Sequence, residues 1–133
     1  MLIDLKININ LRDNKQRVPL HYAFVKIKDW NNKTQIDPIE TVSSLCGQNN
    51  LEIDVPDKWQ KTPLHYAAQR GASISTLYIL NRGADLEAKD IYANTALGIS
   101  LLRGHFNYAI ILIQRKADVK APVFDEFPKR IAK

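Results

Sequence analysis

The chain is poor in residues that build covalent or metal-bound frameworks. Cys46 is its single cysteine, which excludes an internal disulfide and a metal cluster held by several cysteines. One cysteine fits a reducing compartment, so we expect a cytoplasmic or nuclear protein. The longest apolar run, residues 109–113, is far too short to cross a bilayer. The start, Met1-Leu2-Ile3-Asp4, does not resemble a signal peptide.

Catalytic motifs are missing too. The chain has no glycine-rich phosphate loop, no paired-cysteine spacing and no nucleophile elbow. Cys46 falls on the apolar face of an expected helix, which favours a buried structural thiol over a nucleophile. We therefore expect this chain alone to be no enzyme and to hold no cofactor and no metal.

Composition is that of an ordinary globular domain, with 45% hydrophobic and 25% charged residues in a chain of 133. The net charge of +5 is compatible with nucleic acid, an anionic membrane or an acidic protein as partner. Because the basic residues are spread along the chain, most of them are expected to solvate the surface. We expect a protein partner in preference to nucleic acid, and no membrane.

An internal repeat of 33 residues organises the sequence, as the offset from Asp57 to Asp90 shows. At this offset Thr62 pairs with Thr95, Leu64 with Leu97, Gly71 with Gly104, Ala84 with Ala117 and Asp85 with Asp118. An upstream copy, residues 18–24, matches residues 62–68 after a shift of 44. The first copy therefore contains an insertion.

The second copy resembles a complete ankyrin repeat. Its residues are Thr62-Pro63-Leu64-His65-Tyr66-Ala67-Ala68, then Gly71, then Asn81-Arg82-Gly83-Ala84-Asp85-Leu86. The resemblance implies an all-α repeat solenoid, in which helix-turn-helix units are joined by β-turn or hairpin tips. We expect one domain over residues 1–133, divided into the tail of a preceding repeat (1–12), a repeat with an inserted loop at 26–36 (13–56), two further repeats (57–89 and 90–122), and a C-terminal cap or the start of a next unit (123–133).

Local signals place the helices. Thr62 is predicted to cap a helix that begins at Pro63, and Pro38 begins another that ends near Cys46. Ser73 is predicted to cap the next, with Ile74, Leu77, Tyr78 and Leu80 facing inward. Further helices are expected at 96–102 and 106–114, the second covered by Phe124, Phe127 and Ile131. His21 and His65 are expected to bond backbone near the turns rather than a metal.

The resemblance also implies a function, since ankyrin repeats bind other proteins through turn tips and first helices. By position, the expected partner-binding residues are Lys15, Arg17, Lys58, Trp59, Lys61, Gln69, Arg70, Tyr92, Asn94 and Arg103. Aromatic residues and arginines are common interface anchors. We therefore expect a non-catalytic interaction scaffold that captures an acidic or partly apolar partner on its concave face.

Other interpretations stay open. Trp59 and Tyr92 could pack on neighbouring turns while the lysines only solvate. Trp30 in the inserted loop, with Lys26, Lys28 and Lys33, could touch single-stranded nucleic acid. Residues 17–24, followed by the insert and Asp37-Pro38-Ile39-Glu40, are also similar to ankyrin segments of large modular poly(ADP-ribose) polymerases. That similarity implies a module that targets a larger enzyme to its substrate or partner.

Overall fold

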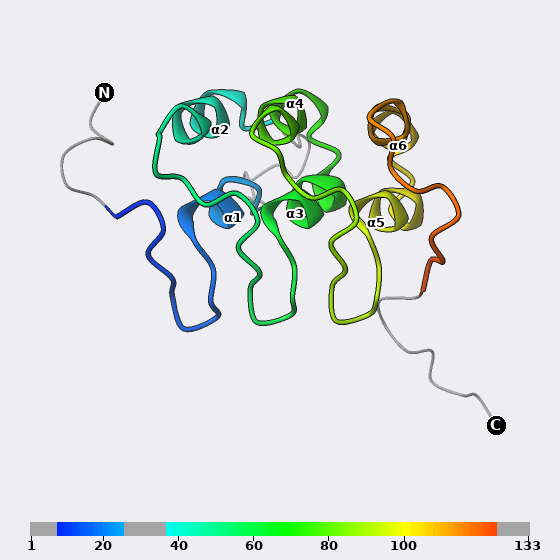
Figure 1. Cartoon of the computed structure of the whole chain (residues 1–133), viewed down its shortest axis with the longest axis horizontal. Coiled ribbons are helices and arrows are strands. Elements are labelled where there is room, and N and C mark those ends of the chain that lie inside the picture. The colour runs from blue at the N-terminus through cyan, green and yellow to red at the C-terminus, as the bar shows by residue number, and fades with distance from the viewer. Residues whose placement is uncertain (1–7, 26–36, 125–133) are drawn as a thin grey trace, which may run out of the picture.

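In a computed structural model of the chain, residues 8–25 and 37–124 are described. These residues form six helices and no strand, in the order α1 (Pro19–Ala23), α2 (Ile39–Cys46), α3 (Pro63–Arg70), α4 (Ser73–Asn81), α5 (Ala96–Leu102) and α6 (Phe106–Gln114). Helices α1, α3 and α5 make one layer, α2, α4 and α6 make the other, and three turns project from the first layer (Figure 1). The predicted repeat solenoid is confirmed, as are the helices predicted at 96–102 and 106–114.

Histidine rings fix the starts of α1 and α3. The backbone N–H of Thr62 donates to Nδ1 of His65 at 3.0 Å, and Nε2 of that ring bonds the carbonyl of Asn94 at 2.9 Å. His21 does the same between Val18 and the carbonyl of Lys61. Burial lowers the pKa of both rings, which keeps them neutral, with one nitrogen accepting and the other donating. Each histidine therefore ties a helix to the turn of the following repeat, which confirms the expected structural role.

Thr62 is the N-cap residue of α3, which begins at Pro63, as predicted. In α3 the Thr62 hydroxyl lies 3.0 Å from Nδ1 of His65. In α5, where Gly98 replaces the histidine, the Thr95 hydroxyl accepts the Gly98 N–H at 3.3 Å. The predicted cap position is therefore confirmed, and in α3 the imidazole ring three residues on contributes to the cap.

Helix α4 corrects two predictions. Ser73 is its first helical residue and not its cap; instead, the Asp37 carboxylate of the preceding repeat accepts the N–H groups of Ile74 and Ser75 at 2.9 and 3.3 Å. Ile74 and Tyr78 were expected to face inward and are exposed, whereas Ser75 is buried. Apolar residues of α4 lie on every side of the helix, so its sequence does not indicate which side is buried. The packing of α4 between α2 and α6 decides it.

The core runs continuously along the stack, and small residues let the repeats approach. Ala67 and Ala68 are fully buried, and Gly71 has φ 74° with the His105 ring against its backbone. Cys46 is buried, and that burial raises the pKa of its thiol, as a structural cysteine requires. No helix of the described part of the chain is long and apolar enough to span a membrane.

The two ends of the stack differ. Ile9 is buried against the first repeat. At the other end the Phe124 backbone bonds the Asn94 side chain, its ring is about half exposed, and Ile110 and Ile113 stay about half exposed as well. The other expected covering residues, Phe127 and Ile131, lie outside the described residues, as do the inserted loop 26–36 and its Trp30.

Candidate protein-binding face

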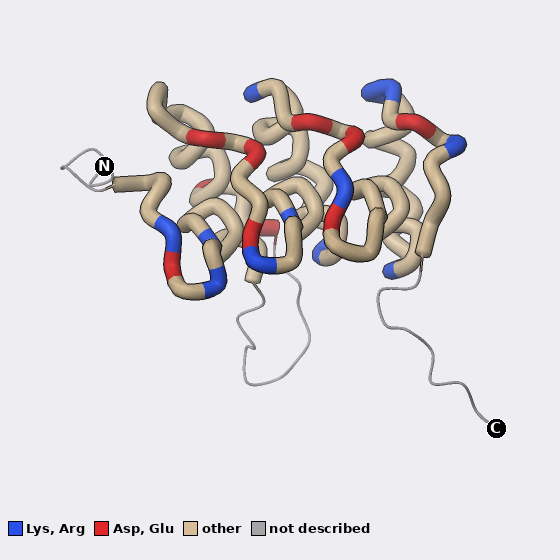
Figure 2. Tube along the Cα trace, turned by 60° about the horizontal axis from the view of Figure 1, so that its bottom comes forward, with Lys and Arg blue, Asp and Glu red and all other residues tan. Residues whose placement is uncertain are grey.

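The three turns are built alike, each around one aspartate. In the second turn Oδ1 of Asp57 accepts the N–H groups of Trp59 and Lys61 at 2.8 and 2.9 Å. Asp13 and Asp90 do the same in the first and third turns. Figure 2 shows acidic as well as basic residues on every turn, yet Asp57 and Asp90 are buried. The carboxylates thus hold the backbone, while lysines and arginines provide most of the charge that faces solvent on these turns.

Backbone hydrogen bonds join one turn to the next. The N–H of Lys58 donates to the Lys15 carbonyl, and the N–H of Ile91 donates to the Trp59 carbonyl, each at 2.9 Å. Since every turn is fixed internally and to its neighbour, the side chains on this row are held at defined spacings. A rigid row of this kind loses little conformational entropy when a partner binds.

Arg17 lies among three aromatic rings. Its guanidinium carbon is 5.5 Å from the ring centroids of Tyr22 and Trp59 and 5.7 Å from that of Tyr66. Its Nε also donates to the Tyr66 hydroxyl at 2.8 Å, and that hydroxyl donates to Asp57. Burial tends to lower the pKa of Arg17, but the oxygens of Tyr22 and Tyr66 outweigh it and the pKa is raised. The side chain is therefore a charged, positioned cation.

Two adjoining hollows lie on this face. The first, of about 340 Å³, is lined by Arg17, Trp59, Lys61, Tyr66, Gln69, Tyr92 and Arg103. The second, of about 270 Å³, is lined by Phe24, Val25, Tyr66, Gln69, Arg70 and Arg103. They share Tyr66, Gln69 and Arg103, so together they form one groove across the first helices. Half of its lining residues are aromatic or apolar, and its charged residues are all basic.

The structure brings together seven of the ten residues expected to bind a partner. Arg17, Trp59, Lys61, Gln69, Tyr92 and Arg103 line the first hollow, and Arg70 lines the second. Lys15 and Lys58 are exposed on the turns outside both hollows, with the Lys58 ammonium 5.8 Å from the Trp59 ring centroid.

Two of these expectations need correction, because their side chains are engaged within the fold. Lys61 is buried, and its ammonium pairs with the Asp90 carboxylate at 2.7 Å. Asn94 is fully buried, and its amide bonds both the N–H and the carbonyl of Phe124 at 2.7 Å. Both were placed on turn tips by their position in the repeat, yet that position points toward the next repeat and not toward solvent.

Sequence reasoning missed Tyr22 and Tyr66. Both occupy the same repeat position, where the third copy has Ile99, and their hydroxyl groups donate to Asp13 and Asp57. A tyrosine repeated at one position beside a repeated aspartate was the available signal.

The described residues hold no group of three or more His, Cys, Asp or Glu side chains that could bind a metal ion. The chemistry that this face offers is contact with aromatic rings and charge-assisted hydrogen bonding from arginine.

Comparison with known families agrees with this architecture. A model described as ankyrin repeats (3 copies) matches residues 30–122, and the chain belongs to the ankyrin-repeat family. Ankyrin repeats are non-catalytic modules that generally mediate protein–protein interaction.

Three curated relatives share this repeat region. The chain is 31% identical over 121 residues to the poly [ADP-ribose] polymerase tankyrase of Caenorhabditis elegans, covering 87% of this chain and 5% of that protein. It is 36% identical over 62 residues to the potassium channel AKT2/3 of Arabidopsis thaliana, covering 47% and 8%. An IkB-like protein of African swine fever virus is 29% identical over 123 residues, covering 92% and 48%. The chain therefore spans less than half the length of each of these relatives.

Proposed function

We propose that this chain is a recognition module that binds an acidic, partly apolar segment of another protein in the groove formed by the two hollows. The observation that carries the proposal is the Arg17 side chain, held by three rings and the Tyr66 hydroxyl at the edge of an aromatic-walled hollow. A guanidinium fixed in this way loses little freedom when it pairs with a carboxylate. Arg103 lines both hollows and is placed to meet a second acidic group.

The test is a peptide titration followed by Trp59 fluorescence in a Trp30→Phe background. The probes are one peptide of aspartate and leucine and one in which lysine replaces aspartate. We expect the acidic peptide to bind preferentially, with affinity that falls as salt rises. Arg17→Gln should weaken it by about tenfold or more, the loss of one charge-assisted pair.

Matched variants decide the result. Arg103→Gln removes a second exposed cation of the groove, whereas Arg115→Gln removes an exposed arginine from α6, away from the groove. Equal affinity in Arg17→Gln, Arg103→Gln and the parent chain would refute recognition by this groove. An equal loss in Arg115→Gln would show that net charge alone attracts the peptide.

The second candidate function is targeting within a larger enzyme, such as an ADP-ribosyltransferase. It is favoured by the similarity to the tankyrase, which covers 87% of this chain but 5% of that protein. Sequencing of the gene on both sides of this region tests it. A transferase domain in the same reading frame supports it, and a reading frame that encodes these repeats alone contradicts it.

The lone, buried Cys46 supports a reducing compartment, and we propose the cytoplasm or nucleus as the site of action. Fluorescence microscopy of the tagged full-length protein checks this, and accumulation in a secretory compartment would contradict it.

A further inference from the structure

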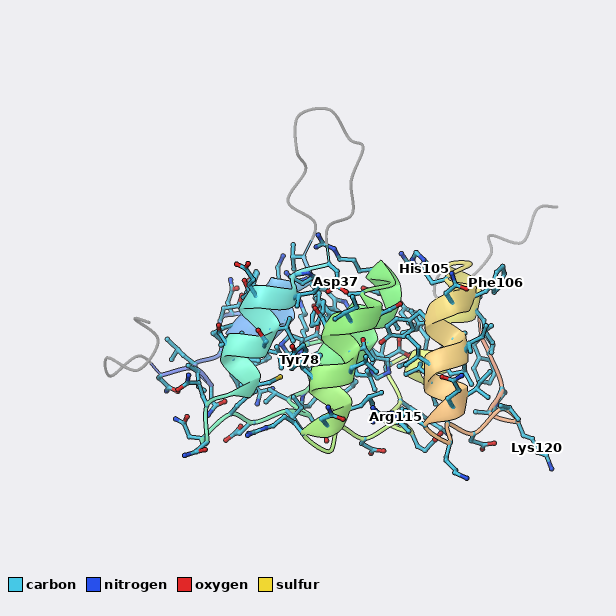
Figure 3. All side chains as sticks on the ribbon, turned by 90° about the horizontal axis from the view of Figure 1, so that it is seen from above. Asp37, Tyr78, His105, Phe106, Arg115 and Lys120 are labelled. Carbon is cyan, nitrogen blue, oxygen red and sulfur yellow. The ribbon has the colours of Figure 1, made fainter. Side chains whose placement is uncertain are left out.

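The side of α6 that is turned away from α4 is apolar and exposed. Phe106, Ile110 and Ile113 follow one another at a spacing that aligns side chains along one helix face, and they are 63, 51 and 45% exposed. Leu101 and Leu102 at the end of α5 are exposed beside them. Figure 3 shows Phe106 and Lys120 on the outer side of α6, with His105 and Arg115 toward α4. We call Leu101, Leu102, Phe106, Ile110 and Ile113 the end face.

Residues 33 positions earlier show that the end face is equivalent to the surface by which the second repeat contacts the third. Leu77 and Leu80 of α4 precede Ile110 and Ile113 by one repeat and are partly covered, since α4 packs against α6. Ala68 precedes Leu101 by one repeat and is fully buried. These repeat positions therefore face the following repeat in the second copy, and in the third copy the same positions are exposed.

Gly71 and Gly104 occupy the same position in successive repeats, and only the first is covered by the next repeat. Gly71 and Gly104 both have φ 74°. The His105 ring lies against Gly71, 2.8 Å from where a Cβ would be, and its Nε2 bonds the Gln69 carbonyl at 3.0 Å. At Gly104 nothing among the described atoms comes within 4 Å of that point. The end face thus continues the inter-repeat interface with a position left open.

Three residues nevertheless make it unlike a docking face for one more repeat of the same kind. Leu101 and Phe106 are large where the second repeat has Ala68 and Ser73, so helices of another repeat could not approach as closely. In the second repeat the Glu87 carboxylate accepts the N–H of Asp118 from the following repeat at 3.0 Å. The equivalent residue in the third repeat is Lys120, whose ammonium group could not accept such a bond from a further repeat.

Charge decides among the remaining occupants. Lys116 and Lys120 are exposed beside the end face, with one exposed carboxylate, Asp118, between them in the sequence. A second copy would bring an equally basic rim, and the chain carries a net charge of +5. The sequence of residues 125–133 has two acidic residues, Asp125 and Glu126, against three basic ones, so it brings no excess of negative charge. An acidic partner is complementary.

We propose that the end face docks an amphipathic helix of another polypeptide, with an apolar ridge on Ile110 and carboxylates toward Lys116 and Lys120. A helix fits because α6 satisfies its own backbone groups and offers only a ridge of side chains, which packs against the ridge of another helix. This interface is separate from the groove, so its outcome is independent of the proposed function.

The probe is a synthetic helix of about five turns with a leucine stripe flanked by glutamates, and its counterpart with lysines in their place. We expect the glutamate helix to bind the full chain about tenfold or more tightly than the lysine helix. Ile110→Ser should weaken binding by about the same factor. Ile74→Ser is the matched control, since both isoleucines are 51% exposed and Ile74 lies outside the end face; it should leave the affinity unchanged.

Four results would overturn the proposal. One is equal binding of the two helices, and another is an equal loss in Ile74→Ser. A third is self-association in analytical ultracentrifugation that Ile110→Ser abolishes, which would identify a second copy as the occupant. The last is faster hydrogen exchange of the α6 amides in a chain ended at residue 124, which would show that residues 125–133 already cover this helix.

Discussion

In the second repeat, residues 57–89, an imidazole ring joins the start of α3 to the following turn, through the Thr62 N–H and the Asn94 carbonyl. In the third repeat, residues 90–122, Gly98 occupies that position and the forward link is the Asn94 side chain on the Phe124 backbone. The two copies share a fold but use different groups to hold the next segment.

A second difference concerns charge. Lys61 of the second repeat pairs with Asp90, the aspartate that builds the third turn. One repeat later the equivalent residues are Asn94 and Val123. A lysine at position 94 would be buried without its carboxylate, which is costly, so the neutral amide and the missing aspartate belong together. The turn position before each of these first helices is therefore matched to the segment that follows rather than to solvent.

The largest effect is expected for His65→Ala. It removes two buried hydrogen bonds and leaves a cavity, and we expect a loss of about 3 kcal/mol in the free energy of unfolding. Urea unfolding followed by circular dichroism measures it. His105→Ala, which removes a partly buried ring, is the control and should cost less. Equal losses in the two variants would mean that the hydrogen bonds of His65 stabilise the fold no more than those of His105.

The paired glycines test whether packing or backbone makes the two repeats differ. Gly71→Ala and Gly104→Ala carry the same left-handed strain of about 1 kcal/mol, but only Gly71→Ala also meets the His105 ring. We expect Gly71→Ala to cost about 1–2 kcal/mol more than Gly104→Ala. The difference should vanish in a His105→Ala background, as a double-mutant cycle would measure. A difference that persists there would place its cause in the backbone.

A smaller effect of opposite sign is expected for Gly98→Ala. An added Cβ would lie 3.4 Å from Oδ1 of Asn94 and 3.5 Å from a methyl carbon of Val123, ordinary contact distances. Alanine is favoured over glycine inside a helix by about 1 kcal/mol, so the melting temperature should rise. A fall would show that α5 and the 123–124 segment need the closer approach that glycine permits.

The smallest effect is the pH dependence that the first two repeats have, and the third lacks, at the position of this histidine. Since burial lowers the pKa of His21 and His65, the unfolded chain binds protons below about pH 6.5 that the folded chain does not. The stability is therefore fully present above that pH and falls as the pH drops toward the folded-state values. Urea midpoints at about pH 7.5 and about pH 5.5 measure the loss. It should shrink in a His21→Asn, His65→Asn variant, and an unchanged slope there would assign it to other groups.

Much of the fold could be predicted because its signals are local. The proline and threonine before α3 and the 33-residue offset located the first helices, and the offset carried over to 96–102 and 106–114 as observed. The cap of α4 could not be predicted, since Asp37 lies 37 residues before the Ile74 N–H that it accepts. The burial of Lys61 and Asn94 likewise depends on partners 29 and 30 residues away.

The sequence by itself determined the repeat, the approximate bounds of the helices, and the row of turns that carries Arg17, Trp59 and Tyr92. These follow from local backbone preferences and from the 33-residue period of the sequence. Only the tertiary structure decided which cations face solvent, which side of α4 is buried and which end of the stack is left apolar. Those outcomes depend on contacts between neighbouring repeats. The energy of such a contact depends on residues of both repeats, so neither stretch of sequence indicates it alone.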